Sequence, residues 1–174
     1  DTEIKALEAT FPSDVFQERF GAIPCPPATL VFKEFSYTKH VKMCPYQKGK
    51  AVQLWVDPGY AHKYAVCVVQ VRGGEVYHID ELWKSGVTAQ DIITGIKKKP
   101  WYKDVGAVVI DVAGRQHPGM ESHVEIWRRL TGLPVYSQPV GIPDGILRHR
   151  TFLTNPETGE PRMFYDPKCK GSLW

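Results

Sequence analysis

The sequence predicts a mixed α/β fold, in which an antiparallel group of strands joins parallel strands through crossover helices. Three apolar segments follow one another between residues 51 and 83, separated by turn-forming residues. A segment with helical periodicity then leads into a β-branched run at 105–110. Because a strand that returns through a helix pairs in parallel with an earlier strand, this order predicts a mixed five-stranded sheet flanked by helices.

Length and composition are those of an ordinary globular domain. The chain has 174 residues, 43% of them hydrophobic, and a net charge of +3. That charge permits a nucleic-acid partner without requiring one. No apolar run approaches 18 residues and there is no signal-peptide pattern, so we expect a protein that is neither secreted nor membrane-spanning. The four cysteines are widely spaced and form no C-x-x-C pair, which argues against a zinc or disulfide scaffold.

Residues 1–50 are expected to be an arm that packs on the sheet, and residues 51–174 the main domain, which we expect to be incomplete at its C-terminus. The arm has little periodicity and five prolines, with a short helix expected at 13–19. In the main domain, Val52, Leu54 and Val56 alternate with more polar positions in a strand that ends at Asp57. The next two strands are expected at 64–71 and 75–83, joined by a tight turn at Gly73 and Gly74.

The later elements are marked by caps and breakers. Thr88 and Asp91 indicate the start of a helix that ends at three lysines, 97–99, before Pro100. A fourth strand, 105–110, ends at Asp111. The remaining expected elements are a helix at 120–131 closed by Gly132, a strand at 133–138, a helix over 145–153, and a strand or extended piece at 162–166.

The two strand-end acids belong together if the fourth strand lies parallel to the first. Asp57 and Asp111 would then face one another at one rim of the sheet, with strands about 4.8 Å apart. Two carboxylates at that spacing repel unless they share a proton or a cation. Oxygen ligands without a nearby His or Cys set favour Mg²⁺ or Mn²⁺, and a pair of such ions can drive phosphodiester hydrolysis. Alternatively, both acids are merely strand-end turn formers.

Cationic side chains near this rim predict contact with a phosphate backbone. Two belong to the loop after Asp111, one follows the turn after Asp57, and three belong to the helix at 145–153. An exposed loop and a solvated helix face would carry the same residue types, so both interpretations stay open. The candidate DNA-binding residues are Lys63, Arg115, His117, Arg148, His149 and Arg150.

Several motifs resemble one known family. LWVDPGY, followed after a crossover helix by VVIDVAG, resembles the ribonuclease H-like nuclease domain of the large terminase subunit of tailed bacteriophages. The arm motifs SDVFQERFGAIP and LVFKEF resemble the link from the ATPase half to the nuclease half, and GIPDGILRHRTFL with RMFYDPKC resembles the C-terminal portion. The resemblance implies a ribonuclease H-like fold, with Asp57 and Asp111 as two of three acids that bind Mg²⁺ or Mn²⁺ in a two-metal site. It further implies endonucleolytic cleavage of double-stranded concatemeric DNA during viral genome packaging.

The resemblance also implies partners and a location. The chain has no G-x-x-x-x-G-K-[ST] motif, so the implied ATPase domain lies outside it. The portal and the small terminase subunit are further implied partners, the host cell cytoplasm is the implied location, and no membrane is involved. The family's third acid has no match here, and Asp166 before Pro167 is typical of a turn. We therefore expect weak metal binding and little cleavage by these 174 residues.

Two alternative functions remain. A resolvase-like or transposase-like nuclease would share the first two acids. A non-catalytic DNA-clamping or docking domain of the packaging motor would use them only as turn formers.

Overall fold

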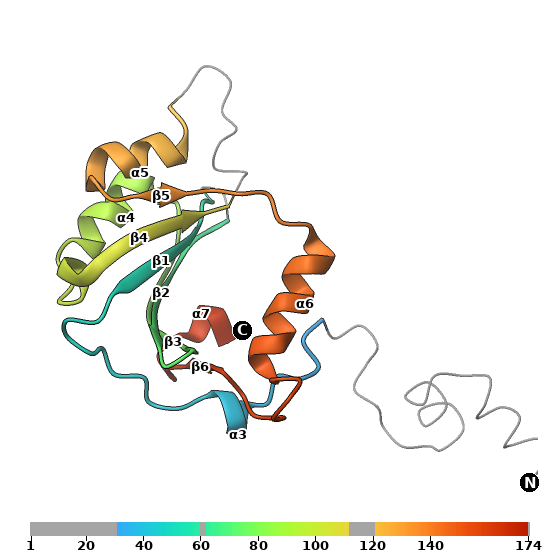
Figure 1. Cartoon of the computed structure of the whole chain (residues 1–174). Coiled ribbons are helices and arrows are strands. Elements are labelled where there is room, and N and C mark those ends of the chain that lie inside the picture. Colours follow the sequence, from blue (N-terminus) through green and yellow to red (C-terminus); the bar gives the residue numbers. More distant parts are fainter. Residues whose placement is uncertain (1–30, 60–61, 112–120, 174) are drawn as a thin grey trace, which may run out of the picture. The chain divides into compact units, whose positions relative to one another are not determined.

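The computed structural model describes residues 31–59, 62–111 and 121–173, and residues 34–174 form one compact unit. The helix expected at 13–19 lies outside the described residues. The unit is built on a sheet with the strand order β5-β4-β1-β2-β3-β6 (Figure 1). The strands are β1 Val52–Asp57, β2 Lys63–Arg72, β3 Glu75–Ser85, β4 Val105–Ile110, β5 Val135–Tyr136 and β6 Met163–Tyr165. The helices are α3 Tyr37–His40, α4 Ala89–Ile96, α5 His123–Thr131, α6 Ile142–Leu153 and α7 Lys170–Leu173, with a 3-10 turn at Tyr102–Asp104.

The mixed sheet is confirmed, and its strand number is corrected. β1, β2 and β3 form the antiparallel meander, and β4 pairs in parallel with β1 on one side and β5 on the other. The sheet has six strands and not five, because Met163–Tyr165 adds to β3 in parallel. All three residues of β6 are buried, so the alternation that reveals a half-exposed strand is missing there.

The helix ends follow local capping chemistry. Thr88 and Asp91 form the expected capping box at the start of α4. α5 begins at His123 and not at 120, because Ser122 and Glu125 form a second capping box. Gly132 closes α5 in the left-handed region, as expected, with φ 70°. Within the described ranges, no helix has both the length and the apolar character needed to cross a membrane.

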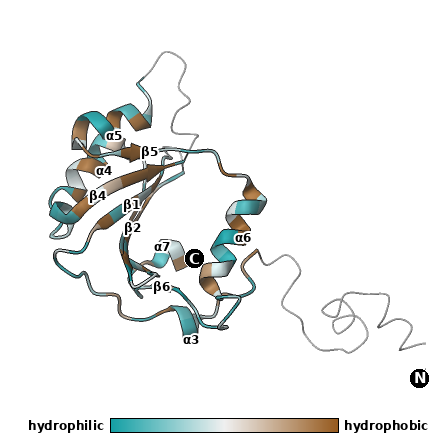
Figure 2. Ribbon diagram, viewed as in Figure 1, coloured by the Kyte–Doolittle hydropathy of each residue, from teal (hydrophilic) through white to brown (hydrophobic). Residues whose placement is uncertain are grey.

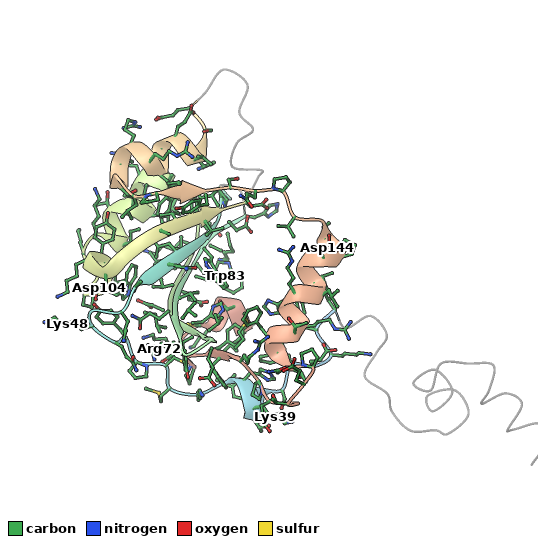
Figure 3. The ribbon with its side chains drawn as sticks, in the orientation of Figure 1. Lys39, Lys48, Arg72, Trp83, Asp104 and Asp144 are labelled. Atoms are coloured by element: carbon green, nitrogen blue, oxygen red, sulfur yellow. The ribbon has the colours of Figure 1, made fainter. Side chains whose placement is uncertain are left out.

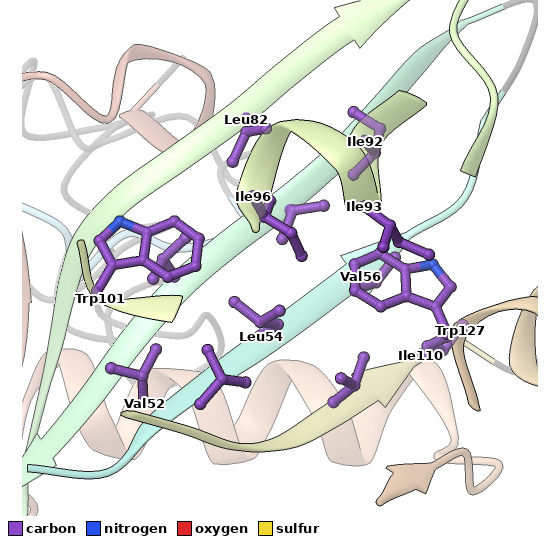
Figure 4. Close-up of a cluster of buried hydrophobic side chains, with 14 of the residues drawn as sticks. Val52, Leu54, Val56, Leu82, Ile92, Ile93, Ile96, Trp101, Ile110 and Trp127 are labelled. Atoms are coloured by element: carbon purple, nitrogen blue, oxygen red, sulfur yellow. The ribbon is translucent and has the colours of Figure 1, made fainter. Parts of the chain in front are cut away.

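The larger core lies between the sheet and helices α4 and α5. Figure 4 shows the isoleucines of α4 facing the inward residues of β1, with Trp101 and Trp127 at the two ends of the cluster. β4 is hydrophobic along nearly its whole length, as Figure 2 shows, in keeping with its position inside the sheet. The labelled members of this core are Val52, Leu54, Val56, Leu82, Ile92, Ile93, Ile96, Trp101, Ile110 and Trp127.

The opposite face of the sheet has a smaller core, under α6 and α7. Trp55 and Cys67 on this face alternate with the residues of the larger core, and Leu153 is the one buried residue of α6. Five of the twelve residues of α6 are exposed, including Ile142 and Leu147, and six are half-buried. The sheet is therefore packed heavily on one face and lightly on the other.

Candidate metal centre

Asp57 and Asp111 stand at neighbouring strand ends. In the parallel β1/β4 pair, Val56 lies opposite Ile110, and each aspartate is the next residue. The Asp111 N–H donates to the Val56 carbonyl oxygen at 3.2 Å, which extends the pairing to the acid itself. With strands about 4.8 Å apart, the two side chains leave the sheet at the same edge. The structure thus brings together the two acids that the sequence singles out.

The position of the two acids disfavours the charged form of Asp57. Both aspartates are exposed at the residue level, but partial desolvation of the Asp57 carboxyl group raises its pKa, and the negative charge of Asp111 raises it further. Both effects disfavour the carboxylate of Asp57. A cation held between the two acids would relieve the second effect directly.

A pocket of about 340 Å³ opens beside Asp57 on the face of the sheet that carries α6 and α7. The strand register explains the side: Asp57 pairs with Ala65, and Ala65 pairs with Trp83, so the three side chains share one face. Figure 3 shows Trp83 on the side of the sheet toward α6. The residues that line the pocket include Asp57, Lys63, Cys67, Glu81, Trp83 and Ser172.

Glu81 is a pocket residue that sequence reasoning missed. Its carboxylate accepts hydrogen bonds from the backbone N–H groups of Gly171 at 2.5 Å and Ser172 at 2.9 Å, and from the Ser172 hydroxyl at 2.9 Å. Burial is the largest cause of the raised pKa of the Cys67 thiol; the charges of Glu81 and Asp57 raise it further, and the Ser172 hydroxyl opposes them. The alternation of β3 could have placed Glu81 on the face opposite Leu82, but nothing local indicates its partner 90 residues away.

The cationic residues expected near the acids are dispersed. Lys63 lines the pocket beside Asp57. Arg148 is exposed on α6, the His149 Nε2 atom lies 3.3 Å from the Tyr165 hydroxyl, and Arg150 pairs with Glu34. The three α6 residues thus do not share one exposed face, and their contact with DNA stays a prediction. Arg115 and His117 lie outside the described residues.

Asp166 has a structural role. It is buried, and its carboxylate accepts from the backbone N–H groups of Cys44 at 2.9 Å and Lys168 at 3.1 Å. These bonds fix the turn that follows β6. Among residues 31–59, 62–111 and 121–173, no group of three or more His, Cys, Asp or Glu side chains is placed to hold a metal ion.

No protein-family model matches the chain, and no curated protein matches it in sequence. Solved structures do match. The nuclease domain of the P22 large terminase aligns with a TM-score of 0.62 at 16% identity, over 84% of this chain and 76% of that one. The fold is that of a terminase nuclease domain. The resemblance seen in the sequence motifs is thereby confirmed at the level of the fold.

Two further terminase structures show the same fold. The large terminase of a thermophilic bacteriophage, solved with ADP, has a TM-score of 0.68 at 16% identity, over 98% of this chain and 42% of that protein. The terminase nuclease of the thermophilic phage G20c, solved with cobalt, has a TM-score of 0.53 at 15% identity, over 82% of this chain and 76% of that one. The chain thus spans about 42% of the length of the longer terminase solved with ADP.

Proposed function

We propose that the chain is the metal-dependent DNA endonuclease module of a viral genome-packaging terminase large subunit. The observation that carries this proposal is the β1/β4 pairing, which sets Asp57 and Asp111 side by side at one edge of a terminase nuclease fold. A resolvase-like or transposase-like nuclease would use the same pair of acids, but the solved structures reported above are terminases.

The acid pair has the donor chemistry of a Mg²⁺ or Mn²⁺ site. Asp57 and Asp111 would hold the cation, since paired carboxylates are hard, anionic oxygen donors. Burial is the main cause of the raised pKa of Asp57, and the neighbouring charge of Asp111 is the second; the second cause supports this assignment, because a bound cation would offset it. When bound, such ions supply an activated water and stabilise the oxygen that leaves in phosphodiester hydrolysis.

Lys63 would bring the phosphate to the acids. It is the first residue of β2 and lines the pocket that Asp57 also lines, so its ammonium group can attract a DNA phosphate to that side of the sheet. Gly171 and Ser172 of α7 line the pocket, so we infer that the scissile strand approaches the acids from the sheet face that carries α7.

The rest of the proposed function concerns the longer protein. The substrate is double-stranded concatemeric DNA, and the module works in the host cell cytoplasm beside an ATPase domain on the same protein. The match to 42% of a longer terminase that was solved with ADP supports the additional domain. The portal and the small terminase subunit are the remaining proposed partners.

A Mn²⁺ titration tests the acid pair. Calorimetry with the 174-residue chain should show weak Mn²⁺ binding that falls at least about tenfold in Asp57→Asn and in Asp111→Asn, a loss of about 1.4 kcal/mol or more. Asp144→Asn is the matched control, because Asp144 is an exposed aspartate in the first turn of α6 (Figure 3) and belongs to neither strand of the acid pair.

Cleavage is measured in the same variants. Any Mn²⁺-dependent nicking of supercoiled plasmid should disappear in the Asp57 and Asp111 variants and persist in the Asp144 variant. If both acid variants bind Mn²⁺ and nick plasmid as the parent chain does, the endonuclease proposal is wrong, and a docking or DNA-clamping role is favoured instead.

A further inference from the structure

The loop at residues 45–50 is held by hydrogen bonds at the end of the sheet away from the acid pair. Its central clamp is Gln70, which is completely buried. The Gln70 amide accepts from the Gln47 N–H at 3.0 Å and donates to the carbonyl oxygens of Gln47 and Lys50, both at 2.9 Å. A buried amide is costly unless its hydrogen bonds are made, and the loop backbone makes them here.

Two further side chains hold the same loop. Arg72 donates to the Pro45 carbonyl oxygen at 2.6 Å and to the Gln70 amide oxygen at 2.5 Å. Asp104 accepts from the Gly49 N–H at 2.6 Å and from the Tyr46 hydroxyl. The loop is therefore fixed from β2 on one side and from the start of β4 on the other.

This fixed loop presents cations. Lys48 and Lys50 are exposed on it, and Lys98 and Lys103 are exposed on the segment that leads from α4 to β4. Lys48 and Lys103 both lie near enough to Asp104 to lower the pKa of that carboxyl group, after the hydrogen bonds that lower it more. Figure 3 shows Lys48 and Asp104 together at this end of the sheet.

Within the described residues, the four lysines form no ion pair with a neighbouring acid. The ion pairs found there are Lys99 with Asp80, Arg129 with Glu121 and Arg150 with Glu34. None of these involves the four lysines, and both hydrogen bonds that Asp104 accepts come from the loop. Lys48 and Lys103 both lie near Asp104, and like charges brought near one another repel, which favours an anionic ligand.

We propose that Lys48, Lys50, Lys98 and Lys103, here called the lysine end, form a second contact for the phosphate backbone of double-stranded DNA. The lysine end works without a metal ion and away from the acids. The choice of DNA over another polyanion rests on the proposed function. Duplex DNA carries one negative charge for about every 1.7 Å of its axis, so several phosphates can meet several lysines at once.

The distance between the two sites suits one duplex. Lys50 and Asp57 are about seven residues apart along an extended chain, and a strand rises about 3.3 Å per residue, so the sites are about 23 Å apart. One turn of duplex measures about 34–36 Å. A single duplex can therefore reach the lysine end and the acid pair within one helical turn.

The test is the salt dependence of DNA binding without divalent metal. Fluorescence anisotropy with a labelled duplex of about 30 base pairs, in EDTA and about 50–200 mM salt, gives the slope of log K against log salt. Each phosphate contact contributes about 0.9 to that slope, so Lys48→Ala/Lys103→Ala should reduce it by about 1.8 and weaken binding at least about tenfold at about 100 mM salt.

Charge-matched variants distinguish DNA binding at the lysine end from a general effect of net charge on DNA binding. Lys48→Glu and Lys39→Glu change the net charge equally. Lys39 is an exposed residue of α3, and Val41, directly after α3, bridges to β6 at the far edge of the sheet from β4. Lys48→Glu should weaken duplex binding at least fivefold and Lys39→Glu less than twofold. Equal losses of affinity in the two variants, or an unchanged slope in the double alanine variant, would disprove the proposal that the lysine end binds DNA.

A Mn²⁺ titration of the lysine variant keeps this inference separate from the nuclease proposal. Lys48→Ala/Lys103→Ala should bind Mn²⁺ as the parent chain does, because the lysine end needs no metal. The salt slope in EDTA then tests the lysine end alone, even if the Mn²⁺ titration of the acid variants disproves the nuclease. If the double alanine variant loses Mn²⁺ binding together with its slope, no separate second contact exists and the inference fails.

Discussion

At the scale of single residues, His78 is notable as a buried histidine with a strongly lowered pKa. It is buried on the lightly packed face of the sheet, where its ring stacks on Tyr165 with centroids 4.4 Å apart and meets the Trp55 ring edge to face at 5.5 Å. Neither ring nitrogen has a hydrogen-bond partner among the described residues. Burial, and then the charge of nearby His149 on α6, lower the pKa of His78 to about 3.

This shift makes the folded chain sensitive to acid. Unfolded His78 binds its proton near pH 6.5 and folded His78 near 3, so the unfolded state holds more protons between these values. Its stability contribution is thus intact above pH 6.5 and is lost progressively as pH falls toward 3. At about pH 5 the loss is about 2 kcal/mol, at about 1.36 kcal/mol per pH unit.

Urea denaturation at about pH 7.5 and about pH 5 measures that loss. His78→Phe keeps the ring stacking and should remove most of the difference between the two pH values. His62→Phe, at an exposed position, should retain the full difference. Equal acid sensitivity in all three proteins would show that His78 does not titrate on unfolding.

The sequence predicted the acid pair but not the rest of the pocket. Asp57 and Asp111 were recognisable because each directly follows an apolar run, and the crossover helix sets the strand direction. Glu81, Cys67 and Trp83 read only as strand residues, because their shared surroundings depend on a segment about 90–105 residues further along the chain. Contacts of that range leave no local pattern.

At the scale of elements, α7 is a short helix held by one strand. Its Gly171 and Ser172 are the groups that donate to Glu81, and Gly171 lies directly against the Trp83 ring. A Cβ atom on residue 171 would overlap that ring. The absence of a side chain at this position therefore permits the contact between α7 and β3.

Gly171→Ala should release α7 from the pocket. We expect a loss of about 1–3 kcal/mol in the free energy of unfolding, as is typical of overpacking, and faster hydrogen exchange at residues 169–173. Gly145→Ala is the matched control, since a Cβ there meets its nearest neighbour, a Val140 methyl carbon, at an ordinary 3.7 Å. Unchanged Trp fluorescence and exchange in Gly171→Ala would contradict the tight contact.

Elements with strong local signals were predicted well, and elements that depend on tertiary pairing were not. α4 was found with its cap because Thr88 and Asp91 are three residues apart. The predicted start of α5, at 120, is three residues too early, although Ser122 and Glu125 have the same spacing as Thr88 and Asp91. β6 is three residues long and exists through its pairing with β3, so its sequence left a strand and an extended piece equally open.

At the scale of the whole unit, the two faces of the sheet differ in packing. The eight-residue α4 buries four residues, whereas the twelve-residue α6 buries one, Leu153. Local opening needs less energy where less apolar surface is buried. The α6 face should therefore open without the rest of the sheet.

Hydrogen exchange can detect that opening. Amides in the first half of α6, residues 142–147, should exchange at least about a hundredfold faster than those of β1 and β2. Leu54→Ala, in the larger core, should cost about 2–5 kcal/mol and lower the protection of β1, β2 and α4 together. Equal protection of α6 and β1 would show that the two faces unfold as one.

The parallel pairing of β1 with β4 makes the acid pair a reporter of correct folding. Asp57 and Asp111 are far apart in sequence and meet only when the crossover is complete and Val56 lies opposite Ile110. A slip of one residue would turn the buried side chains of β4 outward and carry Asp111 away from its partner. A nascent or misfolded chain consequently lacks the paired acids, so any reaction that needs both is withheld from it until the sheet has assembled.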